Sequence, residues 1–232
     1  MKPWELLGET HTSDGTHVTL QRRDREYIIL AAGKPLMSSQ MHGSEQALAT
    51  FGCRNVPDVA PCVLVGGLGM GFTLRATLDI LASGATVYVA ELIPAVADWN
   101  RGPLGPLAEH PLRDTRVRVE LRDVGQTMRA NVNRFDAILL DVDNGPDAFA
   151  TAGNESLYTD RGIEAARDAL RPGGTLAVWS AWENRKFEQR LKYVGFSVKV
   201  ERVRARLKQG GPYHTIFVAR KPLQREATAA EK

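Results

Sequence analysis

Closely spaced glycines that follow an apolar run are the residues of this sequence best suited to binding a ligand. They are Gly66, Gly67, Gly69 and Gly71, and a helical pattern begins directly afterwards at Phe72. Glycine permits the backbone conformations of a tight turn and lets a ligand lie against the main chain. The pattern therefore predicts a loop that binds a nucleoside cofactor. Glycine-rich turns between a strand and a helix also occur without a ligand, so a purely structural loop is the alternative.

Glu91 is the first acidic residue with a predicted role. It directly follows the apolar run Thr86–Ala90, which is typical of a buried strand. In a doubly wound fold, an acid about twenty residues beyond the glycines accepts hydrogen bonds from both hydroxyls of a bound ribose. We predict this ribose contact for Glu91, and the competing interpretation is that the residue only ends a strand.

An acidic segment after the apolar run Phe135–Leu140 is the predicted centre of the chemistry. Asp141 would lie at the carboxyl end of that strand, in the crevice where doubly wound sheets bind ligands. Asp143 and Asp147 follow it closely. Crowded carboxylates attract a cationic amine, and one with a raised pKa could deprotonate that amine for attack on an electrophilic carbon. We predict Asp141 and Asp143 to be catalytic, although residues 144–147 also have the composition of a simple turn.

The elements that must position these residues are predicted from alternating strand and helix patterns. The expected strands are residues 62–65, 86–90, 116–121, 135–140 and 174–179, and the expected helices are residues 72–81, 95–100, 125–132, 160–170 and 185–193. Such alternation predicts a mostly parallel sheet with helices on both faces. Two last strands, residues 197–207 and 213–220, have too short a connection for a crossover helix. The final strand should therefore enter the sheet antiparallel.

A smaller β unit is expected before this α/β region. Residues 17–21 and 26–31 form a predicted hairpin, and residues 44–51 form a helix with Ser44 as its cap. We therefore divide the chain into an N-terminal β unit (1–45), a cofactor-binding catalytic domain (46–222) and a disordered tail (223–232). With 232 residues, 43% of them hydrophobic, the chain can bury one substantial core and a small accessory unit.

Composition excludes several classes of protein. No apolar run approaches the ~20 residues of a membrane helix and the chain does not begin with a signal peptide, so we expect a cytoplasmic protein. The two cysteines are too few for a disulfide framework, and the scattered histidines have no metal-binding spacing. Arg202, Arg204 and Arg206 alternate along one strand face without interleaved aromatic residues, so we expect a solvated face and not a nucleic-acid surface.

The stretch from Val63 to Gly174 resembles the spermidine synthase family, within the superfamily of S-adenosylmethionine-dependent methyltransferases. The resemblance comprises the glycine loop, acids after three successive strands, and the motifs Glu91 with Ile93-Pro94, Phe135 to Asp141 followed by Gly145-Pro146, Leu157-Tyr158, and Ala169 to Gly174. It implies a Rossmann-like methyltransferase fold with a seven-stranded, mostly parallel sheet that ends in an antiparallel hairpin. It also implies an adenine contact from Asp123 and a homodimer. Asp123 is equally suited to capping the following helix.

The chain departs from the family pattern at three places. Gly69 stands where the family loop GGGDGG has the aspartate that holds the aminopropyl amine of decarboxylated S-adenosylmethionine. Gly43 replaces a tyrosine that helps to hold the polyamine, and Asp141-Val142-Asp143-Asn144-Gly145-Pro146 replaces the catalytic DSSDP segment. Without the loop aspartate, the backbone N–H groups at a helix N-terminus suit the charged tail of intact S-adenosylmethionine better.

The sequence therefore favours a transferase that uses S-adenosylmethionine, with methyl transfer to a small, amine-bearing acceptor. The first alternative is aminopropyl transfer from decarboxylated S-adenosylmethionine to a polyamine. The second is a relative that binds the cofactor without turnover, since fold alone does not establish activity. The expected cofactor residues are Gly66, Gly67, Gly69, Gly71, Glu91, Asp123 and Asp141, and no metal is expected.

Overall fold

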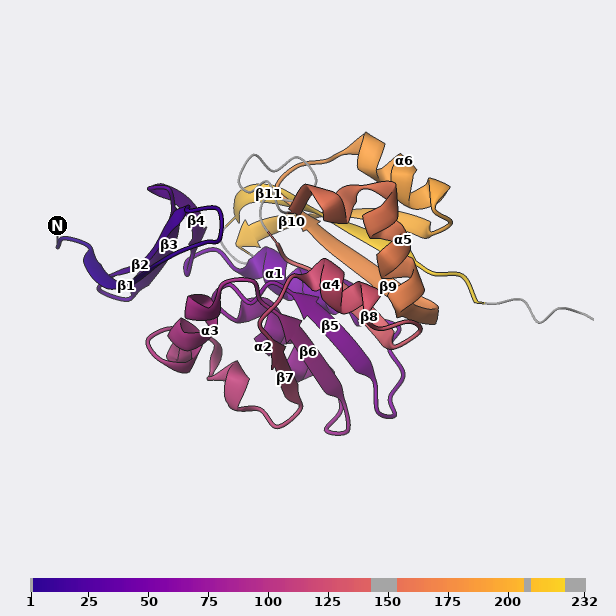
Figure 1. The fold of residues 1–232 in the computed structure, drawn as a ribbon, viewed down its shortest axis with the longest axis horizontal. Helices are drawn as coiled ribbons and strands as arrows, with labels where there is room; N and C mark the ends of the chain where they lie inside the picture. The colour runs from indigo at the N-terminus through magenta and orange to yellow at the C-terminus, as the bar shows by residue number, and fades with distance from the viewer. Residues whose placement is uncertain (1, 143–153, 207–209, 224–232) are drawn as a thin grey trace, which may run out of the picture.

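The protein contains two β-sheets, a small antiparallel one followed by a larger one that is covered by helices (Figure 1). The computed structural model describes residues 2–142, 154–206 and 210–223. Asp143 and Asp147 lie outside these ranges, as do residues 144–146 and most of the predicted tail. The predicted division into domains stays a prediction.

The N-terminal sheet has the strand order β1-β2-β3-β4, with every neighbour antiparallel. Its strands are β1 (Glu5–His11), β2 (His17–Arg23), β3 (Glu26–Ala31) and β4 (Lys34–Ser38). The predicted hairpin is β2 and β3. The sequence prediction missed β1 and β4, because most of their residues are at least partly exposed and their apolar residues do not alternate regularly.

The larger sheet has seven strands in the order β10-β11-β9-β8-β5-β6-β7. They are β5 (Cys62–Gly66), β6 (Thr86–Ala90), β7 (Val117–Glu120), β8 (Phe135–Leu140), β9 (Leu170–Ser180), β10 (Ser197–Arg206) and β11 (Gly210–Arg220). Only β11 runs antiparallel to its neighbours, β9 and β10. The predicted parallel sheet with a terminal antiparallel hairpin is confirmed. Every residue of β5 and β8 is buried, as expected for central parallel strands that are covered on both faces.

Helices cover both faces of this sheet and enclose two hydrophobic cores (Figure 1). The helices are α1 (Gly43–Gly52), α2 (Phe72–Ile80), α3 (Pro94–Arg101), α4 (Val124–Arg129), α5 (Asp160–Ala169) and α6 (Arg185–Tyr193), with short 3-10 turns at Gly105–Ala108, Pro111–Arg113 and Asn154–Tyr158. One core contains residues of α1, α2 and α3, which contribute Leu48, Leu74 and Val96, and it also contains residues of β2 and β3. Helices α4, α5 and α6 pack on the other.

Ser44 does not cap α1, contrary to the sequence prediction. The helix begins one residue earlier, at Gly43, and makes no side-chain capping hydrogen bond. The Ser44 side chain is fully buried, and its hydroxyl is hydrogen-bonded to Glu45 and His214 instead. Tertiary contacts have overridden the local preference of serine for a cap. None of the described helices has the length and apolar character needed to cross a membrane.

Candidate functional site

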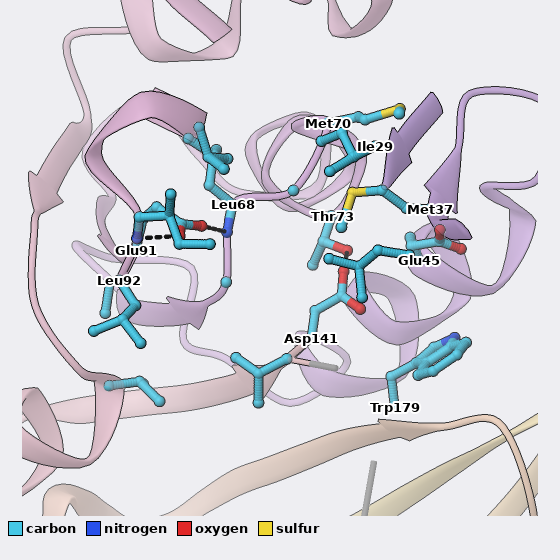
Figure 2. A pocket seen from close by; sticks show the side chains of 18 of the residues that line it. Ile29, Met37, Glu45, Leu68, Met70, Thr73, Glu91, Leu92, Asp141 and Trp179 are labelled. Atoms are coloured by element: carbon cyan, nitrogen blue, oxygen red, sulfur yellow. Dashed lines mark hydrogen bonds between the residues drawn. The ribbon is translucent and has the colours of Figure 1, made fainter. Parts of the chain in front are cut away.

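A cavity of about 440 Å³ lies at the carboxyl ends of β5, β6 and β8, and the N-terminal sheet forms part of its wall. The glycine loop after β5 contributes Gly67 to Met70, and the strands β3 and β4 contribute Ile29 and Met37. Figure 2 shows Glu91 and the loop residue Leu68 on one side of this cavity, and Asp141, Glu45 and Trp179 on the other side. Cavities in this position bind ligands in doubly wound sheets.

Gly67 and Gly69 shape the loop through left-handed backbone conformations. Gly67 has a φ of +88°, and a Cβ atom there would be driven into the backbone carbonyl oxygen of Asp141. Gly69 has a φ of +51°, and its Cβ would lie 3.1 Å from the sulfur of Met37. Position 67 therefore requires glycine, because a Cβ there would meet main-chain atoms, whereas at position 69 glycine avoids a close approach to the flexible end of Met37. Gly66 ends β5 and Gly71 precedes α2, and neither is part of the cavity lining.

Glu91 is buried, and both of its carboxylate oxygens accept hydrogen bonds from main-chain N–H groups. Leu68 N donates to Oε2 at 2.9 Å, and Ile93 N donates to Oε1 at 2.8 Å. Burial raises the pKa of Glu91, while these N–H donors act in the opposite direction. Each oxygen retains a lone pair after these bonds. Glu91 thus both fixes the glycine loop and presents acceptors to the cavity.

Asp123 caps α4 and also lines the cavity, so its two predicted roles are compatible. Its Oδ1 accepts a hydrogen bond from Gln126 N at 2.9 Å and lies 3.7 Å from Arg129 Nη2. Both contacts use the same oxygen. The cap therefore leaves Oδ2 available to a hydrogen-bond donor on a ligand, such as an amino group.

Asp141 directly follows β8 and lies deep in the cavity. Its backbone N–H donates to Gly66 O at 2.9 Å, and its Oδ2 accepts a hydrogen bond of 2.6 Å from the hydroxyl of Thr73 in α2. Burial raises the pKa of Asp141 to about 6, although the Thr73 hydrogen bond opposes this shift. A carboxylate with a pKa near neutrality is suited to accept a proton.

Comparison with known proteins gives a match in structure but none in sequence. No protein-family model matches the chain, and no curated protein matches it. The spermidine synthase from Thermotoga maritima superposes with a TM-score of 0.73 at 18% identity, over 94% of this chain and 73% of that one. A spermidine synthase in complex with the transition-state analogue AdoDATO gives 0.72 at 18%, with the same coverage. A probable spermidine synthase from Corynebacterium glutamicum gives 0.62 at 15%, over 95% of this chain and 81% of that one.

The chain has the spermidine synthase fold. The match extends over both sheets, since it covers nearly the whole chain. The resemblance inferred from the glycine loop and the acids after successive strands is therefore confirmed at the level of the fold.

Glu45 is a second carboxylate near Asp141, and no role was predicted for it from the sequence. It lies in the first turn of α1 and lines the same cavity of the spermidine synthase fold (Figure 2). Burial and the neighbouring charge of Asp141 raise the pKa of Glu45 to about 8. A sequence signal for it exists: Glu45 lies three and four positions before Leu48 and Ala49, so it shares the buried face of the helix.

Trp179 from β9 and His214 from β11 form the wall next to these acids. Their rings meet edge to face, with centroids 4.7 Å apart. Trp179 therefore lines the cavity, whereas Trp99 and Trp182 lie elsewhere. Trp99 is buried in the core under the N-terminal sheet, and Trp182 is largely exposed. Within residues 2–142, 154–206 and 210–223, no group of three or more metal-ligating side chains is present.

Replacing Glu91 with alanine should weaken the binding of an adenosine-containing cofactor by about ten- to a hundredfold, because hydrogen bonds to a charged acceptor are worth ~1.5 to 3 kcal/mol each and water replaces them in part. Calorimetry on Glu91→Ala measures this loss. Glu164→Ala, on the exposed side of α5, is the matched control and should bind like the wild type. Unchanged affinity in folded Glu91→Ala would place the ribose site elsewhere.

Proposed function

We propose that this protein is a transferase that moves an alkyl group from a sulfonium nucleoside to a small amine acceptor. One observation carries the proposal: acids that follow three strands of the parallel sheet, β6, β7 and β8, line one cavity together with the glycine loop after β5. Glu91 and Asp123 are suited to hold the ribose and the adenine, and Asp141 lies beyond the loop, where the reacting centre would be.

The site residues fit such a cofactor. Glu91 and Asp123 both keep acceptor capacity after their contacts within the protein, and Gly67 and Gly69 leave the main chain accessible on the cavity side. The cofactor would supply an electrophilic carbon bonded to a positively charged sulfur. Every other part of the chemistry must come from residues that bind, orient and deprotonate the acceptor.

Asp141 is proposed as the general base. An ammonium acceptor gives one proton to the Asp141 carboxylate, and the freed nitrogen lone pair forms the new bond to carbon. The carbon–sulfur bond breaks and its electron pair stays on sulfur, which becomes a neutral thioether. The Thr73 hydroxyl orients the base through its 2.6 Å hydrogen bond to Oδ2, leaving Oδ1 for the acceptor.

We propose aminopropyl transfer from decarboxylated S-adenosylmethionine in preference to methyl transfer. Five carboxyl groups line the cavity among the residues that the structure describes, and they are those of Asp14, Glu45, Glu91, Asp123 and Asp141. Among the described lining residues, Arg122 alone carries a permanent positive charge, and its Nε lies 3.0 Å from Glu120. The carboxylate of intact S-adenosylmethionine would therefore meet like charges, whereas the ammonium of the decarboxylated form would be attracted. The spermidine synthase fold supports the same choice.

Methyl transfer is the second candidate, and Gly69 is the observation that favours it. The loop itself offers no carboxylate to an aminopropyl ammonium, and Met37 contacts the position where such a side chain would begin. Methyl transfer requires intact S-adenosylmethionine and aminopropyl transfer requires the decarboxylated form. The relative affinity of the protein for these two cofactors therefore distinguishes the two candidates.

Titration calorimetry with both forms of the cofactor tests the proposal. We expect decarboxylated S-adenosylmethionine to bind at least about tenfold more tightly than the intact form, which corresponds to ~1.4 kcal/mol of charge preference. Incubation with small polyamines and mass detection should then show a product heavier by one aminopropyl group. Tighter binding of the intact form, with a methylated product, would establish the second candidate. Binding without any transfer would support a non-catalytic relative.

A further inference from the structure

Helix α1 brings Glu45 to the end of the cavity that contains Asp141. Figure 2 shows Glu45 beside Asp141 and Thr73, with Met37 above and Trp179 below them. The hydroxyl of Ser44 donates to Glu45 Oε2 at 2.7 Å and is also 2.9 Å from Nδ1 of His214. Because Ser44 is fully buried and held by β11 through His214, the Glu45 carboxyl is fixed in place.

The two carboxyl groups are neighbours without a neutralising cation. Within the described part of the chain, the Glu45 carboxyl interacts with the Ser44 hydroxyl and with its own backbone N–H, and Asp141 accepts from the Thr73 hydroxyl. Neither acid forms an ion pair there. Hydroxyls stabilise a carboxylate but do not cancel its charge. Two adjacent charges between apolar walls are unfavourable unless a proton or a cation lies between them.

The other titratable groups around Glu45 do not supply that cation. His214 faces Ser44 from β11, and burial lowers the pKa of its imidazole, so it is neutral near pH 7. His42, just before α1, stacks on Phe72 and hydrogen-bonds to Ser39 O. Arg206 of β10 reaches Gln40 at 3.4 Å. The compensating charge must therefore come from a proton or from the ligand.

We propose that Glu45 determines the charge selectivity of this cavity: together with Asp141 it binds an ammonium group of the ligand, and the pair gives up its shared proton as the ammonium enters. The inference rests on the proposed function and adds a selecting residue to it. The released proton passes to solvent, so the bound state contains two carboxylates and one cation. The raised pKa values of Asp141 (about 6) and Glu45 (about 8) agree with one shared proton near pH 7.

The test compares two ligands that differ in the ammonium. Decarboxylated S-adenosylmethionine carries it, and 5′-methylthioadenosine has the nucleoside and a neutral thioether without it. Decarboxylated S-adenosylhomocysteine, a thioether that keeps the ammonium, shows whether an effect comes from the ammonium or from the sulfonium charge. Calorimetry at pH 7 in two buffers of different ionisation enthalpy gives both the affinity and the number of protons released. For the wild type, we expect about one proton to be released with decarboxylated S-adenosylmethionine and about none with 5′-methylthioadenosine.

In Glu45→Gln the proton release should disappear, and decarboxylated S-adenosylmethionine should bind about ten- to a hundredfold more weakly. The affinity for 5′-methylthioadenosine should stay within a few-fold. Glu45→Asp, which keeps the charge, should retain most of the proton release, and Glu164→Gln is the matched surface control. A thermal melt of each variant confirms that it is folded.

Three results would overturn the inference. Wild-type proton release in Glu45→Gln would remove Glu45 from the pair. An equal loss of affinity for both ligands would mean that Glu45 only supports the structure. If neither ligand binds the wild type, the proposed function fails as well, and this outcome is distinct from the other two because they retain nucleoside binding.

Discussion

Asp141→Asn should lower the rate of transfer by about 10²- to 10⁴-fold, the range typical for the loss of a general base. Affinity for 5′-methylthioadenosine, which lacks the ammonium, should change by no more than a few-fold, whereas decarboxylated S-adenosylmethionine should bind more weakly because one carboxylate of the pair is lost. Asparagine has nearly the same shape, and its amide oxygen can still accept the hydrogen bond from Thr73. It cannot take a proton from the acceptor or balance a cationic charge. Single-turnover kinetics with a saturating polyamine acceptor, together with calorimetry, separates the two effects.

Asp58→Asn is the matched control, because Asp58 is exposed in the segment that connects α1 to β5. It should transfer at the wild-type rate. If Asp141→Asn also keeps a near-wild-type rate across pH 6 to 9, Asp141 is a structural residue. The base would then be sought at Asp143, Asp147 or Tyr158, whose hydroxyl lies 3.2 Å from Val142 O at the end of the same segment.

Gly67→Ala should reduce transfer by more than about 100-fold, because a displacement of about 1 Å at a reacting group can have an effect of this size. The new Cβ would press on the carbonyl oxygen of Asp141 and move the base. The left-handed backbone adds ~1 to 2 kcal/mol of strain and the overpacking ~1 to 3 kcal/mol. We expect the melting temperature to fall by about 5 to 15 °C.

Gly33→Ala is the control that separates the cost of the left-handed backbone conformation from the cost of the contact with Asp141. Gly33 has a similar φ of +74° in the turn between β3 and β4, and a Cβ there would have no atom within 4 Å. It should show the conformational cost alone, as a small loss of stability with unchanged transfer. If Gly67→Ala behaves like Gly33→Ala, the contact between the glycine loop and Asp141 is not needed for the chemistry.

The sequence was sufficient to predict the larger sheet because its parallel strands are buried on both faces. Strand β5 is continuously apolar and β8 is apolar except for Asp136, and the carboxyl ends of such parallel strands must meet at one edge. The loop glycines, Glu91 and Asp141 follow from that rule. The helix boundaries were less accurate: α4 begins at Val124 and ends at Arg129, whereas residues 125–132 were predicted.

The rest of the site could not be predicted because it depends on contacts between distant segments. Glu45 gains its environment only when α1 packs beside α2 and β11 supplies His214. Met37 reaches the glycine loop from β4, an edge strand whose apolar pattern is too weak to identify it. The spacing of Glu45 from Leu48 and Ala49 indicates that it lies on the buried face of α1, but no local pattern indicates which distant segments meet it or Met37.

The contact between Met37 and Gly69 makes two distant positions of the chain interdependent. A Cβ at residue 69 would lie 3.1 Å from the Met37 sulfur and 3.3 Å from its terminal methyl group. The side chain of an aspartate at residue 69 would therefore press on the end of Met37, which would have to move or be replaced by a smaller residue. In an evolutionary path between this loop and one that carries an acid, the two substitutions are coupled: shortening Met37 first removes the close contact, whereas adding the acid first requires the flexible end of Met37 to turn away from the loop.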